Sequence, residues 1–550
     1  MEMRLTLAAS RLLIGSWLLQ FSLALDPQGG ALQKFPPKFG NTTSFVDNFD
    51  FTNNATFEQR TMTFDQWWKP GNPILFFFGG EGSVENFYNA SGAVFEHAQV
   101  LDALVVFLEH RSYGKSVVPK RALTVEQALA DTAWFLSGLR AHLGCQQREC
   151  PIIVLGGSYG GMLVAWFRQK YPHLAAGGIA SSAPIDFYPQ DGRQEAFWNA
   201  TLHTFGKYGL QSCPQELTEA MSQLKQKADT EQGRKEVAMA LGSCQELQNE
   251  TSAGAKADFF LRGVVATLAM LDYPVATNFV TPLPANPVKV ACQRLHQNPG
   301  ISGLRQIMDL FLNSTGGYHC YDLMAEVVGR PTEGHLSGPV KAPDMGHWQY
   351  QACNEMPMQS LTSDGMAFYP ASDDQLVEVA STCQLRYGLT PRTTWLKVNF
   401  GGSDLQVGNL LFTNGEKDPW RVGAPKFESL LEAWICFMIR DTFTSCKSII
   451  CQKNHWGYFT YIYIYKVCIY IYIYKSLLSF PFSSFRYGRE KFQEGLDISQ
   501  HLIPAGAHHE DLRFDSDPPK EAVSVAKAVT LMAMRRWIAV FKTEHQAIMI

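Results

Sequence analysis

The sequence predicts an α/β protein in which a mostly parallel β-sheet carries helices on both faces and a helical cap is inserted into the sheet domain. Three observations lead to this fold class. Short apolar, β-branched runs alternate with helical patterns over the first 190 residues. Clear strand patterns then disappear until about residue 385, and amphipathic runs such as 217–227 and 259–270 predict helices there. A strand pattern resumes at 408–413.

Length and composition agree with this organisation. A chain of 550 residues is long for one compact core, while 46% hydrophobic and 18% charged residues are globular values. A net charge of −4 without any basic block argues against nucleic acid as a partner. The expected parts are a signal peptide at 1–24, sheet-domain segments at 25–190, 386–429 and 491–550, a helical cap at 191–385 and an anomalous insertion at 430–490.

The N-terminus has the pattern of a secretory signal. Arg4 and Arg11 precede an apolar stretch at 12–23, and Ser22-Leu23-Ala24 offers small residues for cleavage. The stretch is too short to span a bilayer comfortably, so no membrane anchor is expected. Six N-x-S/T triplets support passage through the secretory route as glycosylation acceptors: Asn41, Asn54, Asn89, Asn199, Asn249 and Asn313.

The twelve cysteines indicate disulfides rather than a metal site, because no pair has C-x-x-C spacing. Cys145 and Cys150 flank a short polar loop and could bridge. Cys213 and Cys244 could also pair, although the connectivity stays open at this point. Four cysteines fall inside 430–490, which leaves an even number of eight. Neither a metal nor a cofactor is expected.

The first sheet segment can be followed element by element. Residues 25–70 are expected to be an extended entry segment. A strand at 73–78 runs into the glycine turn Gly79-Gly80-Glu81-Gly82, and a second strand is expected at 103–108. Thr124 and Gln127 then form a capping-box pattern, which predicts the start of a helix that ends near Gly144. A further buried strand is expected at 178–184.

The most informative run is Pro151-Ile-Ile-Val-Leu-Gly-Gly-Ser-Tyr-Gly-Gly-Met162. It begins as a buried strand, passes through the G-x-S-x-G pattern at 156–160, and continues as a helix that Pro172 stops. Strand, tight glycine turn and helix is the setting that a nucleophile elbow requires. The pattern therefore predicts that Ser158 is a nucleophile rather than an ordinary turn serine.

A serine hydroxyl needs a base, usually histidine, and an acid that holds the histidine. In α/β-hydrolases these follow in the order Ser, Asp or Glu, His. Asp418 and His508 both follow strand-like runs, which would place them at the same sheet edge as Ser158. Glu416 and Asp404 are rival acids and His509 is a rival base. The oxyanion would take one N–H from Tyr159 and another from Gly79 or Gly80.

One segment does not fit the rest of the chain. Residues 461–465 and 469–474 alternate strictly between Ile and Tyr. A strand is one interpretation, but a TA dinucleotide repeat read in triplets spells the same alternation. We therefore interpret 430–490 as unspliced intron or a gene-model error rather than a selected structure.

Several further stretches together resemble the serine exopeptidases that act beside proline, which include dipeptidyl peptidase II, lysosomal Pro-X carboxypeptidase and the thymus-specific serine peptidase. The chain departs from that family in one respect, because 89 residues separate Asp418 from His508 where family members place the two much closer. Besides the elbow, the matching stretches are 109–116, 123–131, 170–173, 272–274, 283–290, 350–353, 414–415, 418–420 and 506–509.

The resemblance implies an α/β-hydrolase core with a helical cap, a Ser158–Asp418–His508 triad and cleavage after proline or small residues. It also implies that Met162 and Trp420 wall an apolar pocket for the proline ring, a place where core packing is the alternative. We expect release of N-terminal dipeptides with Pro or Ala second, because 283–290 matches dipeptidyl peptidase II closely. Glu81 is then the candidate carboxylate for the terminal amine.

Other functions stay open. A Pro-X carboxypeptidase is the first alternative, and a lipase or esterase of the same fold or a non-catalytic secreted isoform are more distant ones. The expected partners are peptides with proline near one end, without nucleic acid or membrane, and a homodimer is left open. The family implies lysosomes or related vesicles as the location, with secretion as a further option.

Overall fold

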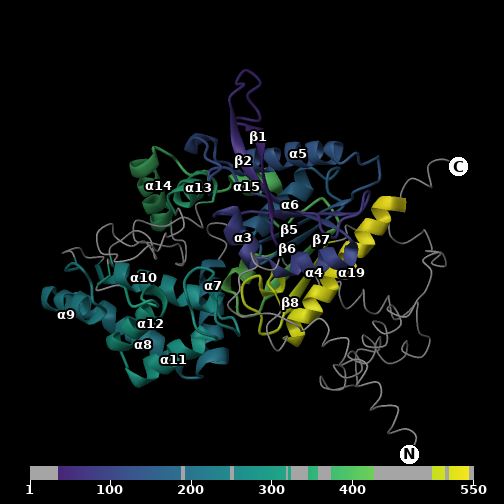
Figure 1. Cartoon of the computed structure of the whole chain (residues 1–550). Coiled ribbons are helices and arrows are strands. Elements are labelled where there is room, and N and C mark those ends of the chain that lie inside the picture. The colour runs from purple at the N-terminus through teal and green to yellow at the C-terminus, as the bar shows by residue number, and fades with distance from the viewer. Residues whose placement is uncertain are drawn as a thin grey trace, which may run out of the picture.

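An eight-stranded, mostly parallel β-sheet lies at the centre of the part of the chain that the structure describes (Figure 1). The computed structural model describes residues 35–187, 193–247, 253–317, 320–321, 323, 345–356, 373–425, 498–514 and 520–543. The predicted signal peptide at 1–24, the sequon at Asn249 and the insertion at 430–490 lie outside these ranges.

The strand order is β1-β2-β4-β3-β5-β6-β7-β8. β1 pairs with β2, and β2 with β4, in antiparallel fashion, while every later pair is parallel. The carboxyl ends of β5, β6, β7 and β8 therefore meet at one edge of the sheet. The strands are β1 (Lys38–Phe45), β2 (Thr56–Phe64), β3 (Ile74–Phe78), β4 (Leu104–Leu108), β5 (Ile152–Gly157), β6 (Gly177–Ser181), β7 (Leu410–Gly415) and β8 (Ile498–Ile503).

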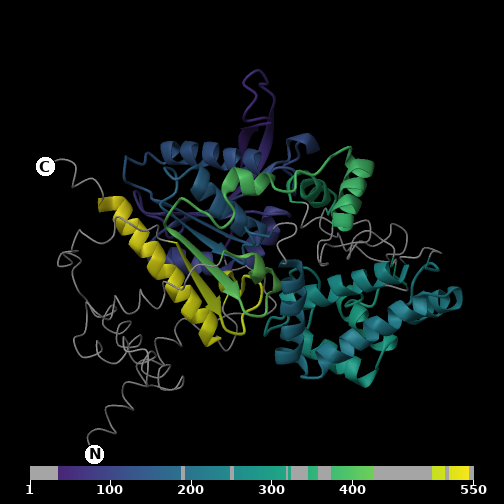
Figure 2. The same cartoon turned by 180° about the vertical axis from the view of Figure 1, so that it is seen from behind.

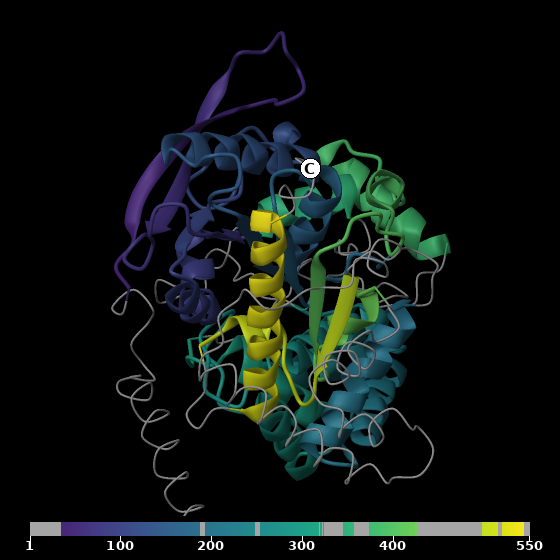
Figure 3. The same cartoon turned by 90° about the vertical axis from the view of Figure 1, so that its right-hand side faces the viewer.

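Helices cover both faces of the sheet, as the sequence predicts, and Figures 2 and 3 show α19 lying along one face. The alternation of β3 explains the two layers. Ile74 and Phe76 pack with α5, α6 and α15, whereas Leu75 and Phe77 pack with α3, α4 and α19. The helices of these layers are α3 (Val84–Ala90), α4 (Gly92–Leu101), α5 (Val125–His142), α6 (Tyr159–Lys170), α15 (Trp395–Phe400) and α19 (Glu521–Thr543).

The predicted cap region contains a second group of helices with a hydrophobic core of its own (Figure 1). The amphipathic run at 217–227 lies in α8, and the run at 259–270 lies in α10. The predicted fold class, an α/β-hydrolase core with an inserted helical cap, is confirmed. The helices after β6 are α7 (Arg193–Thr204), α8 (Cys213–Ala228), α9 (Glu231–Leu241), α10 (Ala253–Met270), α11 (Pro287–Gln297), α12 (Ile301–Leu312), α13 (Met345–Glu355) and α14 (Asp373–Tyr387).

The predicted capping box at the start of α5 forms only in part. Thr124 Oγ1 accepts a hydrogen bond from the backbone N–H of Gln127 at 3.2 Å, as expected. The side chain of Gln127 does not return to Thr124. Its Nε2 donates to Asp47 at 2.6 Å, and its Oε1 accepts from the backbone N–H of Asn48 at 2.8 Å. The side-chain amide of Gln127 is therefore bonded to the loop after β1 and not to the backbone of Thr124, as a complete capping box would require.

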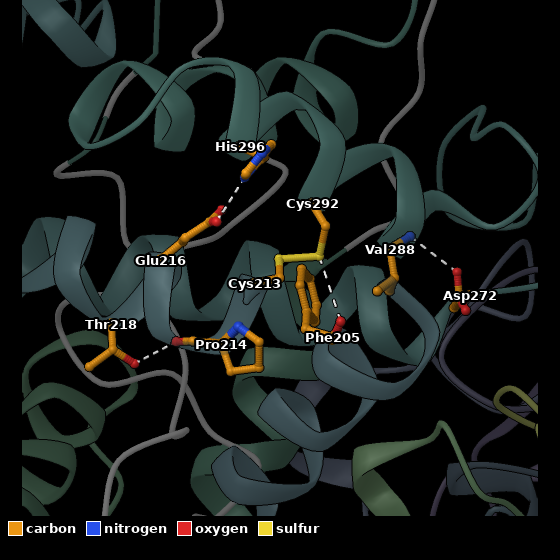
Figure 4. Close-up of a disulfide and its surroundings, with 9 residues drawn as sticks. All are labelled: Phe205, Cys213, Pro214, Glu216, Thr218, Asp272, Val288, Cys292 and His296. Atoms are coloured by element: carbon orange, nitrogen blue, oxygen red, sulfur yellow. Dashed lines mark hydrogen bonds and ion pairs between the residues drawn. A yellow bond between two sulfur atoms is a disulfide. The ribbon is translucent and has the colours of Figure 1, made fainter. Parts of the chain in front are cut away.

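Four disulfides form within the described residues and use all eight cysteines outside 430–490. The predicted bridge between Cys145 and Cys150 is confirmed. The suggested pairing of Cys213 with Cys244 is wrong, because the packing of α8 against α11 brings Cys213 to Cys292 (Figure 4). The remaining bridges are Cys244–Cys320 and Cys353–Cys383.

Five of the six sequons lie within the described residues. Asn41, Asn54, Asn89 and Asn199 are exposed, and Asn313 is half-buried. In the described part of the chain, no helix combines the length and the apolar character needed to cross a bilayer.

The disulfide pattern gives a direct prediction. Proteolysis of the unreduced protein should yield a peptide pair that joins Cys213 to Cys292, and none that joins Cys213 to Cys244. The double substitution Cys213→Ser, Cys292→Ser should lower the free energy of unfolding by about 2–5 kcal/mol, because it frees a long loop in the unfolded chain. Mass mapping and urea unfolding measure the two effects, and a Cys213–Cys244 peptide would contradict the structure.

Candidate active site

Ser158 occupies a strained turn between β5 and α6. Its φ of 57° and ψ of −127° are unusual for a residue with a side chain. A Cβ at Gly156 would collide with the carbonyl group of Gly160, so the turn requires glycine there. The Ser158 N–H donates to the carbonyl oxygen of Ser181 on β6 at 2.9 Å, which ties the turn to the sheet. This is the local geometry that the glycine pattern predicts.

Asp418 and His508 are in direct contact. His508 Nδ1 and Asp418 Oδ2 lie 2.6 Å apart, and both side chains are buried. The other carboxylate oxygen, Oδ1, accepts the backbone N–H of Trp420 at 3.0 Å, within the short helix η3 (Pro419–Gly423). Asp418 follows β7 and His508 follows β8, so the pair lies at the carboxyl edge where β5 delivers Ser158. The carboxylate is thus fixed at both oxygens and can orient the imidazole.

The neighbouring His509 has different surroundings. Its backbone N–H donates to Ser182 Oγ at 2.8 Å, and its ring packs edge-on against Phe279. A Cβ placed on Gly157 would lie 2.9 Å from His509 Cγ, so this ring lies directly on the elbow. Burial lowers the pKa of His509 well below its usual value, and the charge of His508 acts in the same direction. Asp418 is therefore the partner of His508, whereas His509 is a neutral side chain packed beside the turn.

The rival acids lie elsewhere. Glu416 is bonded to Lys207, to the hydroxyl of Tyr208 at 2.7 Å and to the backbone N–H of Ala505 at 3.0 Å. Asp404 is exposed on a loop before β7. Neither carboxylate has His508 among its hydrogen-bond partners in the described residues.

The third contact of a triad would join the hydroxyl of Ser158 to the ring of His508. Among the described residues, no hydrogen bond joins the Ser158 hydroxyl to the His508 ring. The position of His509 on Gly157 nevertheless places the histidine pair beside the elbow. Nucleophile–base hydrogen bonds are often longer in the absence of substrate and tighten when it binds.

The predicted oxyanion donors surround the same turn. Tyr159 is the first residue of α6, so its N–H belongs to the unpaired first turn of a helix. A Cβ on Gly80 would lie 3.7 Å from the Gly160 nitrogen, which places the loop after β3 against this turn. A Cβ on Gly79 would lie 3.1 Å from the carbonyl oxygen of Leu108 instead, so Gly79 is turned toward β4.

The three predicted substrate-binding residues have unequal surroundings. Glu81 is half-buried, and burial raises the pKa of its carboxyl, while the nearby His508 opposes that rise. Trp420 is half-buried and packs edge-on against Phe187 and Phe197, with ring centroids 5.6 and 4.8 Å away. Met162 is 3% exposed and belongs to the core cluster beneath the sheet, as its core-packing alternative anticipates.

The cap makes contacts with both site loops that the sequence did not reveal. Lys417 precedes Asp418 in the sequence. Its Nζ lies 2.6 Å from Asp272 Oδ2, and both side chains are almost fully buried. The hydroxyl of Tyr273 donates to the carbonyl oxygen of His508 at 2.9 Å. The His508 N–H donates in turn to the carbonyl oxygen of Met270 at 3.1 Å. The end of α10 and the residues that follow it therefore contact both the loop of Asp418 and the loop of His508.

A second residue that sequence reasoning missed is Asp511, in the short helix η5 (Glu510–Leu512). It accepts hydrogen bonds from the hydroxyls of Ser181 and Thr413, each at 2.7 Å. Burial raises the pKa of Asp511, and these two hydrogen bonds oppose the rise. Asp511 thus fastens the His508 loop to the ends of β6 and β7, a role that no local motif signals.

The Lys417–Asp272 pair can be tested by breaking one side of it. Asp272→Asn would leave a buried ammonium without its carboxylate, so the free energy of unfolding in urea should fall by about 3–5 kcal/mol. Adding Lys417→Met removes the stranded charge and should recover most of that loss.

The matched control for this experiment is the exposed pair Lys235–Glu231 on α9. Glu231→Gln should leave the free energy of unfolding nearly unchanged, because solvent already screens this pair. A loss for Asp272→Asn no larger than the control would show that the buried pair does not hold the cap to the site.

Comparison with known proteins identifies the family of this chain. The family model described as "Serine carboxypeptidase S28" matches residues 44–449. Human "Lysosomal Pro-X carboxypeptidase" is 33% identical over 396 residues, which cover 69% of this chain and 76% of that protein. The mouse protein of the same name is 34% identical over 400 residues, with 69% and 77% covered. Human "Thymus-specific serine protease" is 28% identical over 423 residues, with 73% and 79% covered.

Among solved structures, proline iminopeptidase of Mycobacterium smegmatis aligns with 91% of this chain and 99% of its own, at 12% identity and a TM-score of 0.33. The four disulfides and the lysosomal names of the relatives suggest the secretory pathway or the lysosome. The family match over most of the chain, together with relatives above 30% identity, shows that the chain belongs to the serine carboxypeptidase S28 family and is a serine-type exopeptidase.

Proposed function

We propose that this exopeptidase cleaves beside a proline near one end of a peptide, by acyl transfer to Ser158 with His508 as base and Asp418 as the orienting acid. The observation that carries the proposal is the buried contact between His508 Nδ1 and Asp418 Oδ2 at the edge where the strained Ser158 turn lies. A serine, an acid and a histidine in this chain order are the components of an α/β-hydrolase triad.

The proton path follows from the atoms in contact. Asp418 accepts the Nδ1 proton of His508, so Nε2 is left as the free acceptor of the neutral ring. Ser158 Oγ attacks the carbonyl carbon while its proton passes to Nε2, and the imidazolium then protonates the departing nitrogen. Water repeats the sequence on the acyl-enzyme, which releases the acid product and restores the serine.

The developing oxyanion would be held by backbone donors. The N–H of Tyr159 supplies one hydrogen bond and that of Gly80 the other, with Gly79 as the alternative. The approach of Gly80 to the first turn of α6 supports this choice. Such preorganised donors contribute a large part of the barrier reduction in acyl transfer.

The proline ring would lie near Trp420. The Trp420 indole is half-buried and lies two residues after Asp418 in the sequence. It packs edge-on against the rings of Phe187 and Phe197. Met162 would close the pocket from the core side. An apolar, aromatic wall suits a pyrrolidine ring that offers no N–H for hydrogen bonding.

For the end of the substrate, we favour release of N-terminal dipeptides with Pro or Ala second. Glu81 is half-buried, and burial raises the pKa of its carboxyl while the charge of the nearby His508 opposes that rise. Its position supports a role in binding the terminal ammonium of the substrate. The names of the human and mouse relatives favour the alternative, removal of a C-terminal residue after proline. Those names also support lysosomes or related vesicles as the working compartment.

Active-site labelling tests the nucleophile. A fluorophosphonate probe should modify Ser158 in the full chain, and Ser158→Ala should abolish labelling and lower kcat by about 10⁴-fold or more. Ser137→Ala, at an exposed position of α5, should change neither result. A folded wild-type protein that the probe does not label would indicate a non-catalytic isoform.

Substrate choice is tested with two peptide sets. Lys-Pro and Lys-Ala amides should be hydrolysed, and peptides that end in Pro-X should not. Glu81→Gln should raise KM for the free-amine substrates by about 10-fold, because a charged hydrogen bond is lost, with little change for the same dipeptides acetylated at the amine. Turnover of only the Pro-X set would establish the carboxypeptidase alternative.

A further inference from the structure

The side chain of Tyr159 extends away from the elbow into a buried polar network. It is 1% exposed, although it follows Ser158 directly. Its hydroxyl lies 3.0 Å from His110 Nε2 and 2.6 Å from Gln351 Nε2. Gln351 is fully buried, and its Oε1 accepts from the hydroxyl of Tyr113 at 2.8 Å. Two protein groups therefore hold the phenol of the residue whose N–H is the proposed oxyanion donor.

The donor and the acceptor of each hydrogen bond in this network can be assigned by starting from the carbonyl oxygen of Arg111. The carbonyl oxygen of Arg111 can only accept, so His110 Nδ1, at 2.7 Å, must donate to it. In the neutral ring His110 Nε2 is then an acceptor, and the Tyr159 hydroxyl donates to it. The lone pair of Tyr159 is left for the Gln351 amide. Burial lowers the pKa of His110 to about 4, so this direction persists in mildly acidic solution.

Gln351 is itself fixed by its helix. α13 places Gln351 and Glu355 one turn apart on the same face, and both are buried. Glu355 accepts the backbone N–H of Val125, the first residue of α5, at 2.9 Å from each carboxylate oxygen. The disulfide Cys353–Cys383 joins the same helix to α14. The side-chain amide of Gln351 is thus attached to a helix that is fixed at two points, by Glu355 and by the disulfide.

We propose that Gln351 is a positioning residue: through the Tyr159 hydroxyl it holds the backbone of the elbow, so that the Tyr159 N–H points at the oxyanion. The inference rests on the proposed acyl transfer. The φ of 57° at Ser158 is a strained value that persists only where neighbours enforce it. On one side the enforcement comes from β6 through Ser181, and on the other it comes from the phenol.

The test compares kcat and KM for Gln351→Met, which keeps the volume of the side chain but donates no hydrogen bond. Loss of one oxyanion donor costs about 10²–10³ in kcat. A displaced donor should cost less, so we expect kcat to fall by roughly 10-fold with KM unchanged. Affinity for a peptide boronate, which forms a tetrahedral adduct, should fall by the same factor, while binding of the cleaved product stays constant.

Tyr159→Phe provides the second arm, since it removes the hydroxyl and keeps the packed ring. It should reproduce the loss seen with Gln351→Met, and the double variant should be no worse than either single one. Gln349→Met is the matched control, because Gln349 is on the same helix and also buried, but its amide oxygen accepts from Tyr387 at 3.2 Å instead. Its kcat should stay within twofold of the wild type.

Two results would overturn the inference. The first is a kcat within twofold of the wild type for Gln351→Met or for Tyr159→Phe. The second is a loss confined to KM or to the melting temperature, which would assign the network a purely structural role. The wild type measured in parallel separates this failure from that of the proposed function, because absence of wild-type labelling and turnover refutes both together.

Discussion

The buried ion pair between Lys417 and Asp272 is the contact on which the geometry of the site depends. It joins the end of a cap helix to the residue before Asp418, and the next cap residue, Tyr273, is bonded to His508. Acid and base come from separate strands, yet both are positioned against the same short segment. A charge pair taken out of water tolerates little displacement, because separation would strand a buried charge. The cap is therefore part of the framework that holds Asp418 and His508 in place.

The local parts of this architecture could be predicted from the sequence. The apolar runs predicted the central strands, and the glycines around Ser158 predicted the strained turn, because both depend on residues close in the chain. The choice between His508 and His509 could not be made from position alone. It depends on Asp418, whose separation of 90 positions from His508 raised doubt that the two meet, and the structure joins them at 2.6 Å.

The missed features are all contacts between distant segments. Cys213 faces Cys292 only because α8 packs on α11. The side chain of Gln127 turns to the loop after β1, which no capping pattern reveals. Gln351 and Tyr159 are 192 positions apart, and Asp511 and Ser181 are 330 apart. Residue types at such separations have no common pattern in the sequence until the fold brings them together.

The parallel pairing of β7 with β8 has a consequence for the protein during its synthesis. Asp418 follows the first of these strands and His508 follows the second, so the ribosome releases Asp418 before His508. Until His508 is translated, an unfinished chain has Ser158 but lacks the proposed base. Under the proposed triad, the order of the strands thus leaves an unfinished chain without hydrolytic activity.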